Sequence, residues 1–371
     1  MTTTSPATAP DVDARVRDLA WTSYARIVAI VAVVLIHVAG YTYANPALKG
    51  TGTWDLAAVL TFSTKWAVPV FVMVSGALLL KPPRDASPLT FYRRRLSRIG
   101  IPLVVWHAVY IGVLVHQAEG AVRWRSIAAG LLRGEVYTAM YFFWLILGLY
   151  VVTPLIWPVV AAFSRRALVV TGLGLTALPA LDLTLQRLIP VLKGTNSVLN
   201  GPTLVTQFLP YVGFFVLGYA LKDVIVRGGR LVALTLATLA MSAIFTLQVT
   251  LLPNLPDPWP KAVNTLLPLS YQGWLLGLGA IGVFMTCRSI AAPSSRLAAP
   301  DIASKVRHLG NLTLGVFACH LLVLYVALRV LDLPKGATSP GMLLALNAGV
   351  VVVSFVVSEV LNRLPLVRRA V

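Results

Sequence analysis

The stretch YARIVAIVAVVLIHVAGYTY, residues 24–43, indicates the fold class of this protein and raises a chemical question. Its length matches the roughly 20 apolar residues that one helix needs to cross the hydrocarbon core of a bilayer. It nevertheless carries Arg26 near its start and His37 in its second half. A charged side chain at bilayer depth costs about 2.5–3.5 kcal/mol or more, so both residues are candidates for a functional site.

The rest of the 371-residue chain has the same apolar character. Hydrophobic residues make up 57% of it and charged residues 12%, and the mean hydropathy is +0.80. So few polar side chains could not cover a soluble globule, which predicts an all-α multi-pass membrane protein with about ten transmembrane helices. The expected spans begin near Tyr24, Trp54, Arg98, Ala139, Ala167, Leu204, Leu231, Leu266, Leu309 and Gly341.

The formal net charge of +18 would suggest a nucleic-acid partner if the protein were soluble. With the N-terminus in the cytoplasm, however, most Lys and Arg residues of the loops fall on the cytoplasmic side, as the positive-inside rule requires. We therefore expect both termini in the cytoplasm and no nucleic-acid partner. Residues 1–20 are predicted to be a disordered and juxtamembrane tail, residues 21–363 the membrane domain, and residues 364–371 a short basic cytoplasmic tail.

Cysteine and acidic residues exclude two further classes of function. Cys287 and Cys319 have no metal-ligand spacing and are expected to be free thiols, and nothing else in the sequence indicates a metal. Acidic residues are almost absent from the predicted spans, which argues against a pump with a carboxylate proton relay.

Arg26 and His37 are predicted to lie on one face of the first helix. Eleven residues correspond to three turns plus about 20°, and to a rise of about 16 Å. Arg26 would lie near the cytoplasmic surface, where its guanidinium fork suits a phosphate group. His37 would lie past the middle of the bilayer, where it could take a proton from an attacking hydroxyl. The alternatives are a snorkelling anchor for Arg26 and a hydrogen bond from His37 to a backbone carbonyl.

Lys65 and a group of arginines are the other candidates. Lys65 lies deep in the second predicted span, where it could bind an oxyanion or the acceptor, pair with a carboxylate, or line water. The following Ser75 and Gly76 are predicted to allow close helix packing. The stretch FYRRRLSRIGIP, residues 91–102, could bind a phosphorylated cytoplasmic donor, or serve as a positive-inside anchor or a site for anionic lipid. Its candidate residues are Arg93, Arg94, Arg95 and Arg98.

Two predicted external segments could cover a substrate site or pack as ordinary loops. The stretch from Glu119 to Val136 mixes charges, Trp and small apolar residues, as an interfacial helix does. Residues 185–202 are expected to form an irregular loop.

Several blocks of the sequence together resemble the acyltransferase-3 family of integral membrane O-acyltransferases, in particular its branch that acts on surface polysaccharides. The most specific block is an arginine followed by ten residues and a histidine, Arg26 to His37. The supporting blocks, in the family's order, are KWAVPVFVMVSGALLL at 65–80, FYRRRLSRIGIPLVVW at 91–106, YFFWLILGLYVVTPLI at 141–156 and LTLGVFACHLLVLY at 312–325. The last block departs from the family's more aromatic GIYLIH pattern, which leaves the role of His320 open between packing and the cavity of His37.

The resemblance implies transfer of an acyl group, often acetyl, from cytoplasmic acyl-CoA to a hydroxyl of a cell-surface polysaccharide or glycolipid precursor. It implies that His37 is catalytic and that Arg26, Arg93, Arg94, Arg95 and Arg98 bind the donor. Lys65 falls at a position that is typically basic in this branch, and we predict that it contacts the acceptor substrate. The expected location is the bacterial plasma membrane, in contact with membrane lipid, and a homo-oligomer is compatible with the sequence. The alternatives are a transporter or flippase of a polar glycolipid, and an acyltransferase acting on a secondary metabolite.

Overall fold

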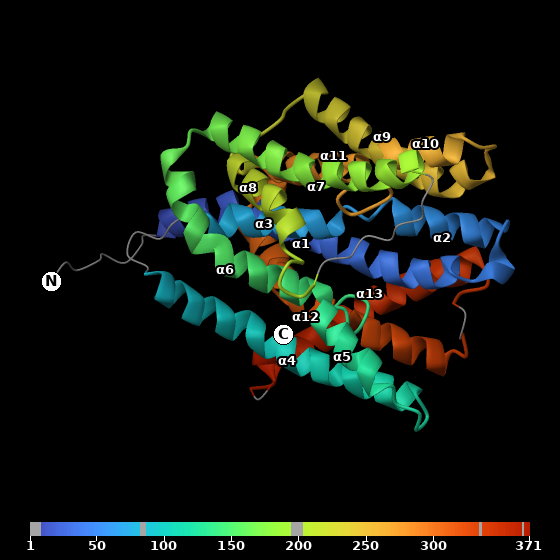
Figure 1. Ribbon diagram of the computed structural model, residues 1–371. Coiled ribbons are helices and arrows are strands. Elements are labelled where there is room, and N and C mark those ends of the chain that lie inside the picture. Colours follow the sequence, from blue (N-terminus) through green and yellow to red (C-terminus); the bar gives the residue numbers. More distant parts are fainter. Residues whose placement is uncertain (1–8, 82–86, 194–202, 334–335, 366) are drawn as a thin grey trace.

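The computed structural model describes residues 9–81, 87–193, 203–333, 336–365 and 367–371, and these form helices and connecting turns without a β-strand. Figure 1 shows the helices arranged as one bundle. Their bounds are α1 Ala9–Tyr43, α2 Gly52–Phe62, α3 Ala67–Leu79, α4 Pro88–Gln117, α5 Trp124–Arg133, α6 Tyr141–Ala162, α7 Arg165–Lys193, α8 Val212–Leu221, α9 Gly229–Thr250, α10 Trp259–Leu266, α11 Trp274–Ile290, α12 Pro300–Val330 and α13 Pro340–Arg363.

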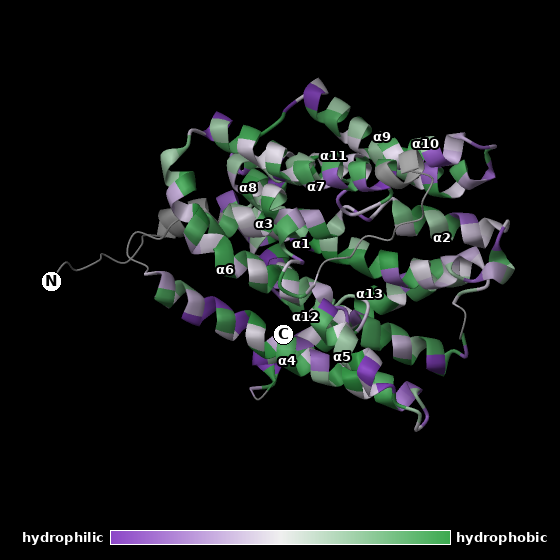
Figure 2. Cartoon of the chain, viewed as in Figure 1, coloured by the Kyte–Doolittle hydropathy of each residue, from purple (hydrophilic) through white to green (hydrophobic). Residues whose placement is uncertain are grey.

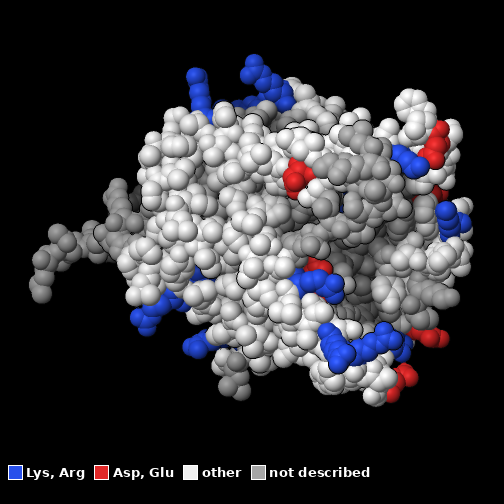
Figure 3. Space-filling view, in the orientation of Figure 1, with Lys and Arg blue, Asp and Glu red and all other residues white. Residues whose placement is uncertain are grey.

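The helices confirm the prediction of an all-α multi-pass membrane protein. Within the described residues, eight helical stretches are long and apolar enough to cross a bilayer, with α2 and α3 together forming one of them. Shorter apolar stretches, Leu209–Leu221 and Trp274–Ile290, lie where two further spans are predicted. Apolar residues run along most of the helices (Figure 2), and one face of the molecule is largely uncharged, with Lys and Arg confined to a few groups (Figure 3). The number of ten spans and the side on which the termini lie stay predictions.

Helix α1 packs against α12, α3, α2, α13 and α11, so its functional residues are held by several neighbours. Small side chains make this packing possible: Ala25, Ala29 and Ala32 of α1 are buried. Helices α3 and α8 approach each other even more closely. A Cβ atom on Gly76 would lie 1.8 Å from the carbonyl oxygen of Phe215, and one on Gly218 would lie 1.9 Å from that of Met73. The predicted packing role of Gly76 is therefore confirmed.

The second span is interrupted, which the sequence analysis does not anticipate. Helix α2 ends at Phe62 and α3 begins at Ala67, with turns between them. Pro69 explains the position of the break, because proline has no N–H to donate to the carbonyl of Lys65 and its ring clashes with that carbonyl in a continuous helix. In the first turn of α3 the same proline is tolerated. Lys65 therefore lies at a helix break and not inside a regular helix.

Of the two segments predicted to be external, one contains the expected helix and the other is more helical than expected. Helix α5 lies inside the segment predicted to be an interfacial helix, and its Trp124 and Leu132 are exposed. Helix α7 continues to Lys193, so the expectation of an irregular loop is wrong for residues 185–193. Residues 194–202 lie outside the described part of the chain.

Candidate functional site

A cavity of about 350 Å³ collects three of the candidate arginines; we call it the Arg26 cavity. Arg26 of α1 and Arg95 and Arg98 of α4 line it, together with the polar side chains of Ser75, Tyr150 and Thr313 and a larger number of apolar ones. Arg26 is held in place from its own helix, since its Nε donates to the carbonyl of Thr22 at 3.3 Å and its Nη2 donates to the Ser23 hydroxyl at 3.3 Å.

Among the residues that the structure describes, no carboxylate forms an ion pair with the three guanidinium groups of the Arg26 cavity. Each of the ion pairs found among the described residues joins other side chains, so none neutralises Arg26, Arg95 or Arg98. Clustered guanidinium groups without counter-ions suit a ligand that carries several phosphate oxygens, because each fork can donate two parallel hydrogen bonds.

A second cavity, of about 260 Å³, contains His37; we call it the His37 cavity. Its walls come from four places in the chain: α1, the end of α4, the segment before α6, and α12. The polar side chains around it are hydroxyl and amide groups. The lining residues are Ile36, His37, Gly40, Tyr41, Ala44, Gln117, Tyr137, Thr138, Leu321, Leu324, Tyr325 and Leu328.

Tyr137 supplies a neutral hydrogen-bond donor to this cavity. Its ring stacks on that of Tyr110 with the centroids 4.6 Å apart. Burial raises the pKa of Tyr137 above its ordinary value, so its hydroxyl stays protonated. Such a hydroxyl can donate to one oxygen of a sugar and accept from another.

His320 lies behind His37, on the neighbouring helix. The centroids of the two imidazole rings are 5.2 Å apart. His320 is completely buried, and its Nδ1 lies 2.7 Å from the carbonyl oxygen of Phe317. The structure therefore places a second histidine against the predicted catalytic one.

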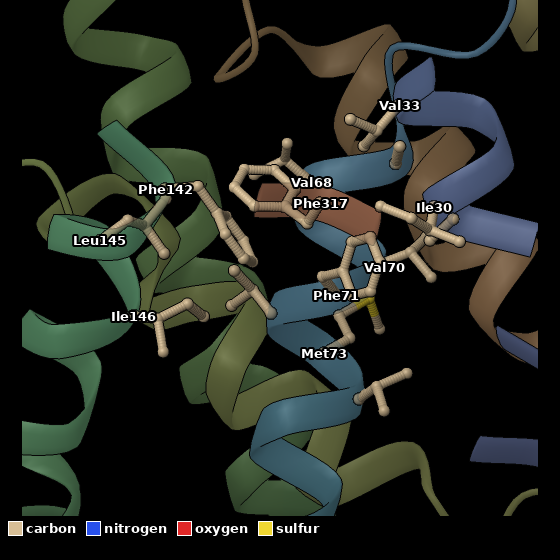
Figure 4. Packing of buried hydrophobic residues seen from close by; sticks show 14 of the residues in the cluster. Ile30, Val33, Val68, Val70, Phe71, Met73, Phe142, Leu145, Ile146 and Phe317 are labelled. Atoms are coloured by element: carbon tan, nitrogen blue, oxygen red, sulfur yellow. The ribbon is translucent and has the colours of Figure 1, made fainter. Parts of the chain in front are cut away.

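Phe71, Phe142 and Phe317 line the Arg26 cavity, and we call them its aromatic wall. The ring of Phe142 lies 4.6 Å from that of Phe317 and 5.8 Å from that of Phe71, and Figure 4 shows these rings with the surrounding core residues. The Phe317 ring is in turn 5.7 Å from that of His320. One continuous series of side chains thus joins the Arg26 cavity to His37.

The family follows from a comparison of the whole chain with protein-family models. The acyltransferase-3 model, described as an acyltransferase domain, matches residues 19–359. The chain belongs to the acyltransferase-3 family. It is therefore a multi-pass membrane acyltransferase, and all five of the sequence blocks that carry the resemblance lie within the matched residues. Comparisons with curated proteins and with solved structures found no match.

In this acyltransferase the predicted donor arginines are divided between two environments. Arg95 and Arg98 line the Arg26 cavity, whereas Arg93 and Arg94 are not among its lining residues. Arg95 is half-buried, and the other three arginines are exposed on α4. Arg94 and Arg98 are one helical turn apart, and so, approximately, are Arg95 and Arg98. The pair that lines the cavity is Arg95 and Arg98.

Lys65 is not among the residues that line the Arg26 cavity or the His37 cavity. Its Nζ is 5.2 Å from the centroid of the Phe62 ring and 5.3 Å from that of Tyr271, within the range of cation–π attraction. No carboxylate of the described residues forms an ion pair with it. Its predicted contact with the acceptor stays a prediction.

The tyrosines, the glutamine and the aromatic wall around the two cavities cannot be recognised as site residues from the sequence. Tyr137, Tyr325 and Gln117 lie at or near the ends of predicted spans, where aromatic and polar residues are common as interface anchors in any membrane protein. Phe142 and Phe317 are indistinguishable in sequence from lipid-facing or core residues. Only their position beside charged side chains from other helices reveals them.

Proposed function

We propose that this acyltransferase moves an acyl group, acetyl in the first instance, from cytoplasmic acyl-CoA to a hydroxyl of a cell-surface polysaccharide or glycolipid precursor at the plasma membrane. The observation that carries the proposal is the pair of cavities along α1. Three guanidinium groups, without an ion-pair partner among the described residues, line one cavity, and an imidazole lines the other. Arg26 and His37 are separated along α1 by about 16 Å.

The Arg26 cavity is suited to the donor. Acyl-CoA has phosphate groups at one end and its thioester at the end of a long flexible arm. Arg26, Arg95 and Arg98 would hold phosphate oxygens, while the arm would extend along α1 past the aromatic wall toward His37. Binding energy gained at the phosphates would thereby position a reacting group that is remote from them.

The His37 cavity is suited to the acceptor. Its tyrosine, threonine and glutamine side chains match the hydroxyl groups of a sugar, and Lys65 would contact another part of the acceptor. His37 would take the proton of the attacking hydroxyl as its oxygen bonds to the thioester carbon. The carbon–sulfur bond then breaks, and the CoA thiolate takes the proton from His37. A relay of the acyl group through His37 would use the same geometry.

The proposal is tested by acyl transfer from radiolabelled acetyl-CoA to glycan or lipid in membranes that contain equal amounts of each variant. We expect His37→Ala to lower turnover by about 10²–10⁴-fold, because it removes the general base. Arg26→Ala should mainly raise the acetyl-CoA concentration needed for half-maximal rate, by about 10–100-fold, because it removes charge-assisted hydrogen bonds.

Arg93→Ala is the matched control, since Arg93 is an exposed arginine on the same helix as Arg95 and Arg98 but outside the cavity. Arg93→Ala should change neither the turnover nor the acetyl-CoA concentration needed for half-maximal rate by more than about twofold. Unchanged labelling with His37→Ala would rule out His37 as the base. Absence of labelling with the wild type, for every acyl-CoA tried, would favour the transporter.

A further inference from the structure

We infer that His320 is a positioning residue for His37. Its Nε2 accepts a hydrogen bond from one ring N–H of His37, and so directs the other, unprotonated ring nitrogen of His37 into the His37 cavity. The inference deepens the proposed function and rests on it, because it assigns a partner to the general base of that reaction.

The hydrogen bonds of His320 determine which of its nitrogens carries the proton. Nδ1 lies 2.7 Å from the carbonyl oxygen of Phe317 and 3.3 Å from that of Val316. A carbonyl oxygen can only accept, so Nδ1 must be the donor. In the neutral imidazole Nε2 is then an acceptor with a free lone pair.

That lone pair is buried without a partner among the described residues. His320 is completely buried, and its Nε2 has no hydrogen bond. His107 shows what a satisfied buried histidine looks like in this protein. Its Nδ1 lies 2.7 Å from the Leu103 carbonyl, and its Nε2 accepts from the indole N–H of Trp144 at 3.1 Å. An unpaired buried acceptor is destabilising, and an apolar side chain of similar size would avoid that penalty.

His37 is the side chain placed to satisfy this acceptor. The ring centroids are 5.2 Å apart and the ring planes are inclined by 42°. When two imidazole rings at this separation face each other edge to edge, a nitrogen of one comes within about 3 Å of a nitrogen of the other, the length of a hydrogen bond. The torsion that rotates an imidazole ring has a broad minimum, so His37 can turn into this arrangement without leaving its rotamer.

The arrangement supports proton transfer without a carboxylate. Before reaction, one N–H of His37 bonds to Nε2 of His320 and its other nitrogen faces the acceptor hydroxyl. When that nitrogen takes the hydroxyl proton, His37 carries two protons and one positive charge. The hydrogen bond to His320 then becomes charge-assisted and stronger. His320 itself gains no proton, and the departing thiolate later removes the one that His37 received.

Two substitutions at His320 distinguish positioning from packing. His320→Gln keeps a side-chain acceptor, whereas His320→Met fills the site without one. We expect His320→Met to lower kcat for acetyl transfer by about 100-fold, with the KM for acetyl-CoA changed less than twofold, because only orientation of the base is lost. His320→Gln should recover at least a tenth of the wild-type kcat. Cys319→Ala, a change at the adjacent buried residue, which points about 100° away around α12 and lines a different pocket, should leave kcat unchanged.

A second readout does not depend on activity. The chain has five histidines, so ¹⁵N-histidine-labelled protein in lipid vesicles gives few ring-nitrogen signals, which single substitutions assign. We expect His320 in the Nδ1–H form, and a shift of the His37 nitrogen signals in His320→Met but not in Cys319→Ala.

Each outcome decides between the two claims. The inference would be overturned if kcat is unchanged in His320→Met, or if the His37 nitrogen signals do not shift in that variant. The proposed function would still stand if His37→Ala is inactive. Failure of the wild type to transfer any acyl group, with the coupled His37 signals present, would overturn the proposed function while retaining the hydrogen-bonded pair.

Discussion

Arg26 and His37 lie on one helix face but line different cavities, because the eleven residues between them correspond to about 16 Å along the helix axis. The arginines of α4 cannot be assigned to the Arg26 cavity from the sequence alone. Four arginines lie within six positions, yet only Arg95 and Arg98 line the Arg26 cavity. The periodicity of one helix shows which arginines share a face, but it does not show which face meets α1.

Arg98 provides a test at the residue scale. We expect Arg98→Ala to raise the KM for acetyl-CoA by about tenfold or more, because a charge-assisted hydrogen bond to phosphate contributes about 1.5–3 kcal/mol. Arg94→Ala should change this KM by less than about twofold, because Arg94 does not line the Arg26 cavity. Saturation curves with labelled acetyl-CoA measure both. Equal effects at the two positions would mean that diffuse charge, and not the cavity, binds the donor.

Helices α3 and α8 are held together by backbone contact at Gly76 and Gly218. In a membrane, small residues at helix interfaces allow close van der Waals packing that larger side chains prevent. The contact places α3, with Ser75 and Phe71 of the Arg26 cavity, in a defined position. The packing of this element therefore has direct consequences for the site.

Substitution of Gly76 tests that packing. Gly76→Ala should destabilise the protein by about 1–3 kcal/mol or more, because the added methyl group would lie 1.8 Å from a backbone oxygen and the helices must separate. Gly112→Ala on α4 is the control, since a Cβ there meets nothing within 4 Å. The melting temperatures of the two variants in detergent are compared by heating each protein and measuring, by size-exclusion chromatography, how much folded protein remains. Equal melting temperatures would show that α3 and α8 are not tightly packed.

The aromatic wall gives a prediction about the acyl chain. Phe142→Ala enlarges the Arg26 cavity, so we expect the kcat/KM for butyryl-CoA relative to acetyl-CoA to rise about tenfold or more, since one methylene in a pocket is worth about 1–3 kcal/mol. Phe284→Ala, at a buried phenylalanine packed on Trp21, is the control and should leave this ratio unchanged. An unchanged ratio in Phe142→Ala would mean that the acyl chain does not pass the wall.

At the scale of the whole molecule, the charges of the loops predict which side of the membrane each end of the bundle faces. Starting from a protein with Cys287 and Cys319 replaced by serine, we expect Ser126→Cys to react with a membrane-impermeant maleimide in intact cells. Ser304→Cys should react only after the cells are opened. Both serines are exposed. The reverse pattern would invert the topology and place the Arg26 cavity on the outer side.

The amino-acid sequence by itself predicts the membrane class, the family and the candidate residues Arg26, His37 and Lys65. These properties are local: a bilayer demands long apolar runs, and a charged residue within such a run stands out without knowledge of its neighbours. Family membership likewise depends on blocks of residues that can be read in order along the chain.

Only the tertiary structure shows that Arg95 and Arg98 join Arg26, that His320 lies against His37, and that Phe317 of the Arg26 cavity packs on His320. The physical reason is that the spans are apolar on nearly every face, so hydropathy does not indicate which side of a helix meets which neighbour. Contacts between α1, α4, α6 and α12 depend on side-chain size and helix packing. The chemistry of the site is therefore present in the sequence, while its grouping into two cavities is a property of the folded bundle.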